Sequence, residues 1–389
     1  MTVRLGVAAL ISVIAFTLAA VPAPAQTPPT VTSGLPAWRA PGGLLSVRGT
    51  AAPGAAIELW IGAVKRAEAV SGPGGGFTFS VRVPGTPRDY AVAVVSEGIR
   101  VEAGTLPVRP VRIAAGGDVN LGEGVGEAMR RYGTRWPWLS VAPVLRRADI
   151  AVVNLEACVS TRGRPVPNKE FHFRGTPASL RTTRRYAGID VVSLANNHSL
   201  DFGRVAFADT LAYAKSYGLR TIGGGKNLAA ARRPAVLTRG GLRIAFLGYS
   251  DVRPPGFDAG PGRSGAAPAL PAYVRADVRA ASRAADVVVV YFHWGIELAR
   301  RPSARQKLLA RVSRAAGADV VLGAHPHVLQ PRERRGNRFV AWSLGNFVFD
   351  WTSPGTDRTG ILRLGLARNG VRSASFLRAR INWVQPRLQ

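Results

Sequence analysis

All five histidines of this 389-residue chain lie between residues 172 and 327, and four of them stand in short polar phrases. Two acidic phrases precede these in the chain. Imidazole, carboxylate and carboxamide groups together are the ligands that divalent transition metals take in proteins. The clustering therefore indicates a metal site. The phrases are Gly117-Asp118-Val119-Asn120, Val153-Asn154-Leu155-Glu156, Asn196-Asn197-His198, His293-Trp294-Gly295 and Gly323-Ala324-His325-Pro326-His327.

Four of the five phrases end or follow an apolar run typical of a buried strand. The runs cover residues 111–115, 150–155, 191–195, 244–248, 287–292 and 320–323. Helical patterns at 177–186, 205–217, 272–285 and 303–316 alternate with them, which predicts a layered α/β domain over residues 111–385. The carboxyl ends of parallel strands meet at one rim of a sheet. We therefore expect one site made from Asp118, Glu156, Asn197, His293, His325 and His327.

Each phrase also has a purely structural interpretation. An aspartate after a strand often caps a helix or begins a turn. Asn197-His198 could be a turn, His293-Trp294 a buried packing pair, and His325-Pro326-His327 a stiff loop. Their shared position at strand ends favours the metal site over these separate alternatives. A carboxylate that bridges two cations, with histidines around each, would clamp the attacking and leaving oxygens and supply a hydroxide at neutral pH.

The charge of the chain is strongly positive. It holds 52 basic and 23 acidic residues, for a net charge of +29, and only five of the basic residues are lysines. Such a surface attracts polyanions, among them anionic lipids, cell-wall polymers and polycarboxylates. An even spread of arginine over solvated faces is the alternative. No basic run interleaved with aromatic residues is present, so we expect no nucleic-acid partner.

The first 25 residues are typical of a signal peptide. Arg4 precedes an apolar stretch over residues 5–20, and Ala23-Pro24-Ala25 matches the small-x-small pattern of a cleavage site. We expect an exported protein of the cell envelope or a secreted one. An uncleaved N-terminal membrane anchor is the alternative. The only cysteine, Cys158, excludes an internal disulfide, so the fold depends on its core.

The segment after the signal predicts a separate small module. A linker rich in Pro, Thr and Ser covers residues 26–38. Residues 39–108 then contain short runs of period two separated by Gly and Pro turns, which is typical of a β-sandwich. In pattern it resembles the immunoglobulin-like modules appended to bacterial surface enzymes. We expect a spacer or a binding module without chemistry of its own.

Residues 111–351 resemble the CapA family, which is associated with synthesis of poly-γ-glutamate capsules and is related to the calcineurin-like metallophosphoesterases. Besides the five phrases, the resemblance includes Leu121-Gly122, Phe173-Arg174, Ser199-Leu200-Asp201-Phe202-Gly203, Ile296-Glu297 and Ser343-Leu344-Gly345-Asn346-Phe347. It implies a metallophosphoesterase-like domain with α/β/β/α layers, preceded by the β module. It also implies two divalent ions, which could be manganese, iron or zinc.

The resemblance implies a role for each matching residue. Asp118 and His327 would bind the first metal, Glu156 would bridge, and Asn197, His293 and His325 would complete the second. His198 would act near the leaving oxygen, with Asp201 orienting it. Arg174 would bind a substrate carboxylate or phosphate. Glu297 and Asn346 would lie near the metals or face substrate.

One departure from the related phosphoesterases concerns the first metal. They place a histidine two residues after the first aspartate, where this chain has Asn120, and they have aspartate at the bridging position of Glu156.

The expected partners are an anionic cell-surface polymer or a phosphorylated substrate, together with capsule-synthesis membrane proteins. Three functions stay open: action on a cell-surface polyanion, a metal-dependent phosphoesterase with a small substrate, and a polymer-binding protein without turnover.

Overall fold

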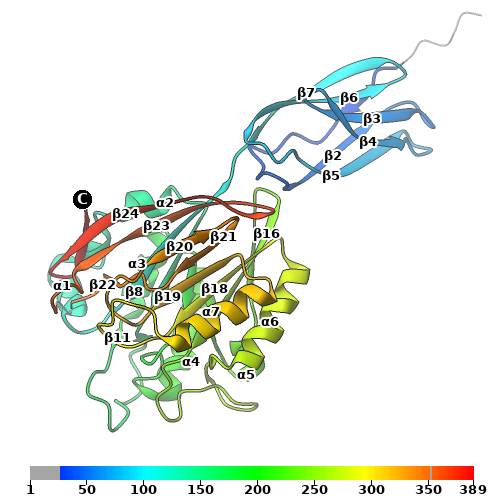
Figure 1. The fold of residues 1–389 in the computed structure, drawn as a ribbon. Helices are drawn as coiled ribbons and strands as arrows, with labels where there is room; N and C mark the ends of the chain where they lie inside the picture. Colours follow the sequence, from blue (N-terminus) through cyan, green and yellow to red (C-terminus); the bar gives the residue numbers. More distant parts are fainter. Residues whose placement is uncertain (1–26, 351–352) are drawn as a thin grey trace, which may run out of the picture.

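The computed structural model describes residues 27–350 and 353–389. The predicted signal peptide, residues 1–25, lies outside the described residues. Among those that are described, every helix is too short or too polar to cross a membrane. The chain forms a small module of strands, coloured blue to cyan, and a larger α/β part (Figure 1).

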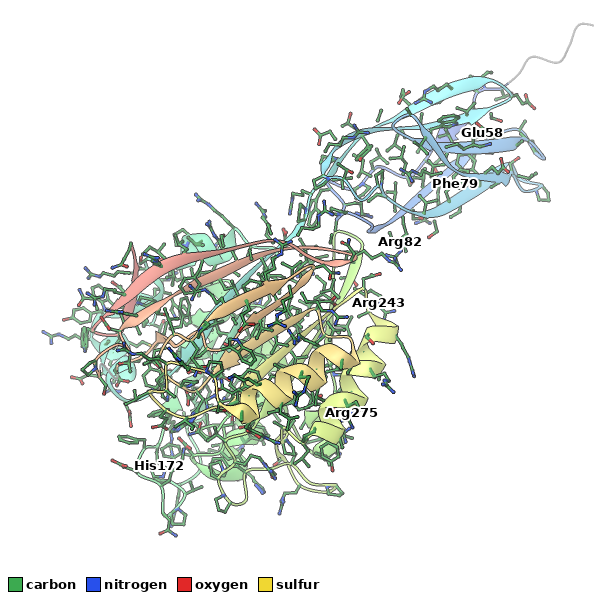
Figure 2. The ribbon with its side chains drawn as sticks, viewed as in Figure 1. Glu58, Phe79, Arg82, His172, Arg243 and Arg275 are labelled. Carbon is green, nitrogen blue, oxygen red and sulfur yellow. The ribbon has the colours of Figure 1, made fainter. Side chains whose placement is uncertain are left out.

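The regular secondary structure of residues 30–108 consists of strands, which are arranged in two sheets. Alternate side chains of β2 are buried, as expected for a strand with one face on a core. These buried side chains pack with others of both sheets into one apolar cluster that includes Leu45, Ile57 and Phe79 (Figure 2). The first sheet has the order β1 (Thr30–Val31), β2 (Leu44–Thr50) and β5 (Gly76–Arg82), and the second the order β4 (Val64–Val70), β3 (Ala56–Ile61), β6 (Arg88–Ser96) and β7 (Ile99–Val108).

The module begins earlier than predicted and is attached to the larger domain by backbone contacts. Strand β1 lies within the predicted linker and pairs with β2. The amides of Ala40 and Leu44 donate to the carbonyls of Gly240 and Gly241 at 2.8 and 3.0 Å. The Arg109 guanidinium lies 3.6 Å from the ring centroid of Trp38. The immunoglobulin-like character of the module stays a prediction.

The larger domain contains an eight-stranded sheet in which β8, β9, β12 and β13 are parallel neighbours. Strand β22 pairs with the carboxyl end of β8, and β23 with its first half. The sheet order is β13 (Arg220–Ile222), β12 (Val191–Ser193), β9 (Ile150–Leu155), β8 (Val111–Val119), β23 (Arg358–Ala367), β24 (Gly370–Asn382) and β25 (Gln385–Leu388), with β22 (Asn346–Val348) beside β8. Because β25 ends at Leu388, the domain extends past the predicted boundary at residue 385.

The second sheet of this domain has six strands. Its four central strands are parallel and its two edge strands antiparallel. Seven of seven residues in β18 are buried, as expected for a strand covered on both faces. The order is β15 (Ala235–Arg239), β16 (Leu242–Ser250), β18 (Val287–His293), β19 (Val320–Ala324), β21 (Arg338–Ala341) and β20 (Arg332–Arg335).

Helices cover the outer face of each sheet. One apolar cluster joins the eight-stranded sheet to α1, η1, α2, α3 and α4, and another joins the six-stranded sheet to α6 and α7 (Figure 1). The helices are α1 (Glu123–Tyr132), η1 (Trp136–Trp138), α2 (Ala142–Arg146), α3 (Pro177–Arg185), α4 (Gly203–Tyr217), α5 (Leu228–Ala231), α6 (Pro271–Ala284) and α7 (Ala304–Ala316). Two short pairs complete the domain: β10 (Cys158–Val159) with β11 (Arg174–Gly175), and β14 (Gly224–Gly225) with β17 (Gly265–Ala266).

The two sheets pack face to face through a third apolar cluster. It contains Ile113 and Val152 from the first sheet and Phe246 and Val289 from the second. The Tyr291 hydroxyl also donates to the carbonyl of Gly116 at 2.7 Å, which ties the sheets together near their carboxyl ends. The layers therefore run helix, sheet, sheet, helix, and the predicted mixed α/β architecture is confirmed.

Candidate metal centre

Strands of both sheets end at the same place and bring the predicted polar residues together. Asp118 is the penultimate residue of β8, and Glu156 directly follows β9. From the other sheet, His293 ends β18 and His325 directly follows β19. These side chains are buried, so their charges and ring nitrogens must interact with one another or with a bound ion. The site is thus shared by two sheets.

Glycines explain how the backbone segments approach so closely. A Cβ atom on Gly117 would overlap the carbonyl oxygen of Gly345, and one on Gly323 would overlap that of Trp342. Asp118 donates its amide to the Gly345 carbonyl at 2.9 Å, and its Oδ2 accepts the amide of His325 at 3.0 Å. The glycines before Asp118 and before Ala324-His325 are therefore needed for packing.

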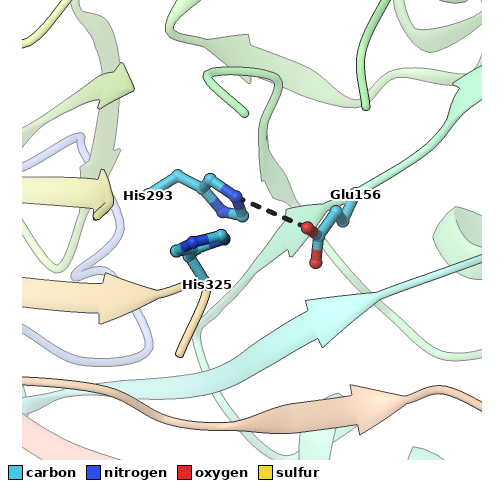
Figure 3. A group of neighbouring side chains, drawn as sticks. All are labelled: Glu156, His293 and His325. Carbon is cyan, nitrogen blue, oxygen red and sulfur yellow. Dashed lines mark ion pairs between the residues drawn. The ribbon is translucent and has the colours of Figure 1, made fainter. Parts of the chain in front are cut away.

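Glu156 is the most unusual side chain of the site. Its carboxylate is completely buried, and neither oxygen has a hydrogen-bond partner among the described residues. Its Oε1 lies 3.4 Å from His293 Nε2 (Figure 3). The same oxygen lies 3.9 Å from His198 Nε2. Ligand atoms of Glu156 lie within 4.8 Å of those of His293 and His325, and also within 4.8 Å of those of Asp118 and His327. Glu156 thus belongs to two groups that could each hold a metal ion.

Burial controls the protonation of these groups. Desolvation raises the pKa of Glu156 well above its usual value, and the nearby charge of Asp118 raises it further. Burial also raises the pKa of Asp118, against the opposing effect of His327. The pKa of His325 falls to about 3 and that of His293 falls well below its usual value, both mainly through burial. Neutral imidazole is the form that binds a metal, and a cation would compensate the two buried carboxyl groups.

Two asparagines hold His293 in position. Asn154 Nδ2 lies 3.1 Å from His293 Nδ1 and also donates to Asp118 Oδ1 at 2.8 Å. The Nε2 of His293 lies 2.7 Å from Asn197 Oδ1. An amide nitrogen can only donate, so Asn154 requires His293 Nδ1 as an acceptor and leaves the proton on Nε2. A metal would replace this proton and bring Asn197 Oδ1 and His293 Nε2 to the same ion.

His325 and His327 lie in a strained loop. Both have positive φ angles, 92° and 57°, which residues with a side chain rarely adopt. The Nδ1 of His325 is buried without a hydrogen-bond partner. The Nδ1 of His327 lies 2.7 Å from Asn346 Oδ1 and 3.7 Å from Asp118 Oδ2. Asn346 is buried and contacts His327, so it orients that ring from behind.

His198 stands beside the metal groups and is held by its other nitrogen. Its Nδ1 lies 2.7 Å from Asp201 Oδ2 and 2.8 Å from Lys169 Nζ. Its ring stacks on Phe173 with centroids 3.9 Å apart. Burial lowers the pKa of His198 to about 4, although the hydrogen bond with Asp201 opposes the shift. The contacts with Asp201 and Lys169 hold Nδ1, so that Nε2 is directed toward Glu156. Burial keeps the ring neutral at neutral pH.

The two remaining predicted residues lie in different surroundings. Glu297 is exposed, and its carboxylate lies within 4.8 Å of ligand atoms of His325 and His327. The guanidinium of Arg174 lies 3.4 Å from the ring centroid of Phe202 and donates to the carbonyl of Gly163. Neither Phe202 nor Gly163 belongs to the groups of side chains that could hold a metal ion.

A cavity of about 380 Å³ opens beside the metal groups. Four carboxylates and three phenylalanines contribute to its wall, together with two of the histidines. Asn120 lies behind this wall: its Oδ1 accepts the amide of Gly122 at 2.8 Å, and its Nδ2 donates to Asp350 at 3.4 Å. Asn120 thus supports the loop that carries the acidic wall. The lining residues are Glu123, Glu170, Phe171, Phe173, His198, Glu297, His327, Phe349 and Asp350.

The wall of the cavity makes a testable contribution to the pH dependence of stability. Burial, followed by the charge of Asp350, raises the pKa of Glu123 from 4.5 to about 7. The folded protein therefore holds this proton more tightly than the unfolded chain, and the resulting stability is lost as the pH rises through about 7. We expect the unfolding temperature of the wild type to fall, relative to that of Glu123→Gln, between about pH 5 and pH 8. Calorimetry at several pH values, with Glu127→Gln as the control on the same helix, measures this; a constant difference would contradict it.

The sequence did not single out some of the groups that shape the site. Asn154 was visible inside an acidic phrase, but only the structure shows its contacts with both Asp118 and His293. Lys169 comes from a loop without regular structure, donates to the Asn197 carbonyl at 2.7 Å and pairs with Asp201. The raised pKa of Glu123 depends on Asp350, which is far away in the sequence.

The donor set fits a divalent metal. It combines carboxylates, imidazoles and a carboxamide oxygen, and it includes two carboxylate oxygens and one ring nitrogen that are buried without partners. Buried polar atoms of this kind normally have a ligand or hydrogen-bond partner. The residues therefore suggest a metal site at the shared ends of the two sheets.

Comparison with known proteins identifies the family. The model of the bacterial capsule synthesis protein PGA_cap family matches residues 112–351. The chain is 34% identical over 259 residues to the PGA biosynthesis protein CapA of Bacillus subtilis, covering 66% of this chain and 67% of that protein. It is 33% identical over 264 residues to the capsule biosynthesis protein CapA of Bacillus anthracis, covering 66% and 64%. The chain thus spans about two thirds of the length of these relatives.

Solved structures show more distant similarity. A hypothetical protein from Thermus thermophilus has a TM-score of 0.44 and 18% identity, covering 70% of this chain and 100% of that one. A 5'-nucleotidase precursor from the same organism has a TM-score of 0.38 and 14% identity, covering 72% and 54%. The family match covers the strands that carry the metal groups, from β8 to β22. The CapA proteins are relatives of this chain, and the chain belongs to the bacterial capsule synthesis protein PGA_cap family.

Proposed function

We propose that this chain is an exported CapA-like protein that acts in the synthesis or export of an anionic cell-surface polymer, poly-γ-glutamate, through a site for two divalent ions. One observation carries the proposal: the buried carboxylate of Glu156, without hydrogen-bond partners, belongs to two of the three groups of side chains that could hold a metal ion. Its place in a domain of the capsule synthesis family supports the link to the polymer. The signal-peptide pattern of residues 1–25 supports export, and capsule-synthesis membrane proteins are the proposed partners.

The residues divide the proposed work between two ions. Asp118 and His327 would hold the first, Asn197, His293 and His325 the second, and Glu156 would bridge them. Bound metal would supply a nucleophilic hydroxide and charge stabilisation at an acyl or phosphoryl centre. His198 Nε2, held toward Glu156 by Asp201, would lie near the leaving oxygen or nitrogen. It could donate a proton there only from the imidazolium form, which burial opposes and the hydrogen bond with Asp201 favours. The metallophosphoesterase-like fold and the immunoglobulin-like module belong to this proposal.

A producing strain tests the proposed function directly. A poly-γ-glutamate-producing bacterium that lacks its own CapA protein is expected to recover surface polymer when this chain is expressed. The Glu156→Ala variant is expected to fail, because both metal groups lose a shared ligand. The Arg275→Ala variant, changed on an exposed part of α6, serves as the control. Equal polymer with wild type and Glu156→Ala would contradict a role for the metal groups.

A metal-dependent phosphoesterase with a small substrate is the second candidate. The position of His198 favours it, since an imidazole that Asp201 holds with Nε2 toward Glu156 can protonate a leaving alkoxide when the ring carries both protons. We expect aryl-phosphate hydrolysis that depends on Mn²⁺ and falls at least about a hundredfold in His198→Ala, within the range for general acids. Metal content measured on the same samples should be unchanged in that variant. Metal retention with no turnover of any ester by the wild type would instead favour polymer binding without catalysis.

A further inference from the structure

A second polar cavity lies at the junction of the module and the larger domain, remote from the metal groups. Its volume is about 440 Å³, and four arginines line it. They come from four separate segments: Arg82 ends β5 of the module, Arg243 lies in β16, Arg283 in the last turn of α6, and Arg368 between β23 and β24. Figure 2 shows Arg82 and Arg243 at the facing ends of the module and the larger domain. The proposed metal chemistry does not use this cavity.

The single acidic group in the lining is Asp286, which the arginines surround. Its Oδ1 lies 2.9 Å from Arg82 Nη1 and 3.4 Å from Arg368 Nε, and its Oδ2 accepts the amide of Arg243 at 2.9 Å. Two guanidinium groups thus pair with Asp286, and over the whole lining the four arginines exceed the one carboxylate by three charges. The side chains of Arg82 and Arg368 are 42% and 58% exposed, so both keep donors available to a ligand.

We propose that this junction cavity binds consecutive carboxylates of a polycarboxylate chain. Arginine forks suit carboxylates, and two of the arginines already pair with a carboxylate of the protein, Asp286. The cavity beside the metal groups has the opposite character, because four carboxylates in its wall repel a polyanion. The polymer is therefore held at the junction, and only a segment or end of it reaches the metal groups.

The module contributes directly to this binding site. Arg82 is its only residue in the lining, and the Arg82–Asp286 pair joins the module to the larger domain. Strand β16 runs from Arg243 at the junction to Ser250, which pairs with His293. At roughly 3.3 Å per residue, this strand separates the two sites by about 20 Å. An extended polymer of several units can bridge that distance.

The test compares two double variants of equal charge, one in the cavity and one outside it, with the wild type and a single cavity variant. Wild type, Arg82→Gln/Arg368→Gln, the single variant Arg283→Gln and the control Arg130→Gln/Arg275→Gln are titrated with fluorescein-labelled poly-γ-glutamate at two salt concentrations. Both control arginines are exposed and lie outside the cavity. We expect wild-type affinity to fall as salt rises. At low salt the double cavity variant should bind about tenfold more weakly, and the control pair should stay within about twofold of wild type.

The outcomes separate the proposal from its alternatives. Equal losses in the cavity pair and the control pair would mean diffuse attraction and would overturn the site, as would tighter binding of polyphosphate than of poly-γ-glutamate. The ion pairs described at the junction are those of Arg82 and Arg368 with Asp286, so a weaker Arg283→Gln variant cannot be attributed to the loss of either pair. The choice of a polycarboxylate rests on the proposed function, but Glu156→Gln should still bind the polymer. Polymer binding that persists in this variant would support the junction cavity as the binding site, even if the metal groups have no role in polymer synthesis.

Discussion

Replacing Glu156 with glutamine is expected to abolish tight metal binding while leaving the metal-free protein at least as stable as the wild type. Glu156 is shared by both metal groups, so its loss weakens each of them. Changes in residues that only support metal ligands already cost about 10- to 100-fold in affinity. For a shared ligand we therefore expect a loss of at least about a hundredfold.

The stability of the metal-free variant follows from the same burial. The wild-type carboxylate is completely buried without hydrogen-bond partners among the described residues, and desolvation raises its pKa well above the usual value. A neutral amide of the same shape avoids the cost of the buried charge. Elemental analysis and titration with Mn²⁺ measure the first effect, and calorimetry with chelator measures the second. Glu127→Gln, changed at an exposed residue of α1, is the control. A Glu156→Gln variant that binds metal with wild-type affinity would show that neither of the two groups that contain Glu156 is the metal site.

The second large effect is expected at Gly117, where alanine should destabilise the protein by about 3 kcal/mol, at the upper end of ordinary overpacking. The added Cβ would overlap the carbonyl oxygen of Gly345, which accepts the amide of Asp118. Relief requires β8 and the segment before β22 to separate, and this moves Asp118 and Asn346 away from His327. We therefore expect weaker metal binding together with lower stability.

Gly262→Ala is the matched control for this substitution. No atom lies within 4 Å of the Cβ that it would introduce, and its φ angle is not in the left-handed region. Urea unfolding of both variants measures the difference in the free energy of unfolding. Gly117→Ala with the stability of Gly262→Ala would show that the two segments are not in the close contact described above.

The sequence was sufficient to predict that the residues of the metal groups lie close together, because the strand ends that carry them follow from local patterns. Buried strands are recognisable as apolar runs, and the carboxyl ends of parallel strands meet at one rim, so Asp118, Glu156, His293 and His325 could be placed together. The split of these strands between two sheets was not recognisable from the runs themselves. It depends on long-range pairings, such as that of β22 with β8, which no local pattern encodes.

Other parts of the site depend on loops and on neighbours distant in sequence. Lys169 lies in a loop, where neither periodicity nor turn signals predict which side chains it contacts. The resemblance implied a substrate-binding role for Arg174, but its stacking on Phe202 follows from the path of the chain between β11 and α4. The acidic wall requires Glu123 and Asp350 to meet, and they are brought together by the pairing of β22 with β8.

The division of the metal groups between two sheets has a mechanical consequence. Asp118 and Glu156 lie at the ends of strands of one sheet, and His293 and His325 at the ends of strands of the other, so a bound ion would join the two layers. It would add to the apolar packing and to the hydrogen bonds between the sheets, such as the one from the Tyr291 hydroxyl. At a metal concentration a hundred times the dissociation constant, one such ion adds about 2.7 kcal/mol to the cohesion of the layers. Chelation should therefore speed amide hydrogen exchange in β8, β9, β18 and β19 together. A bound ion would cross-link the two layers, and its removal would allow them to separate more readily.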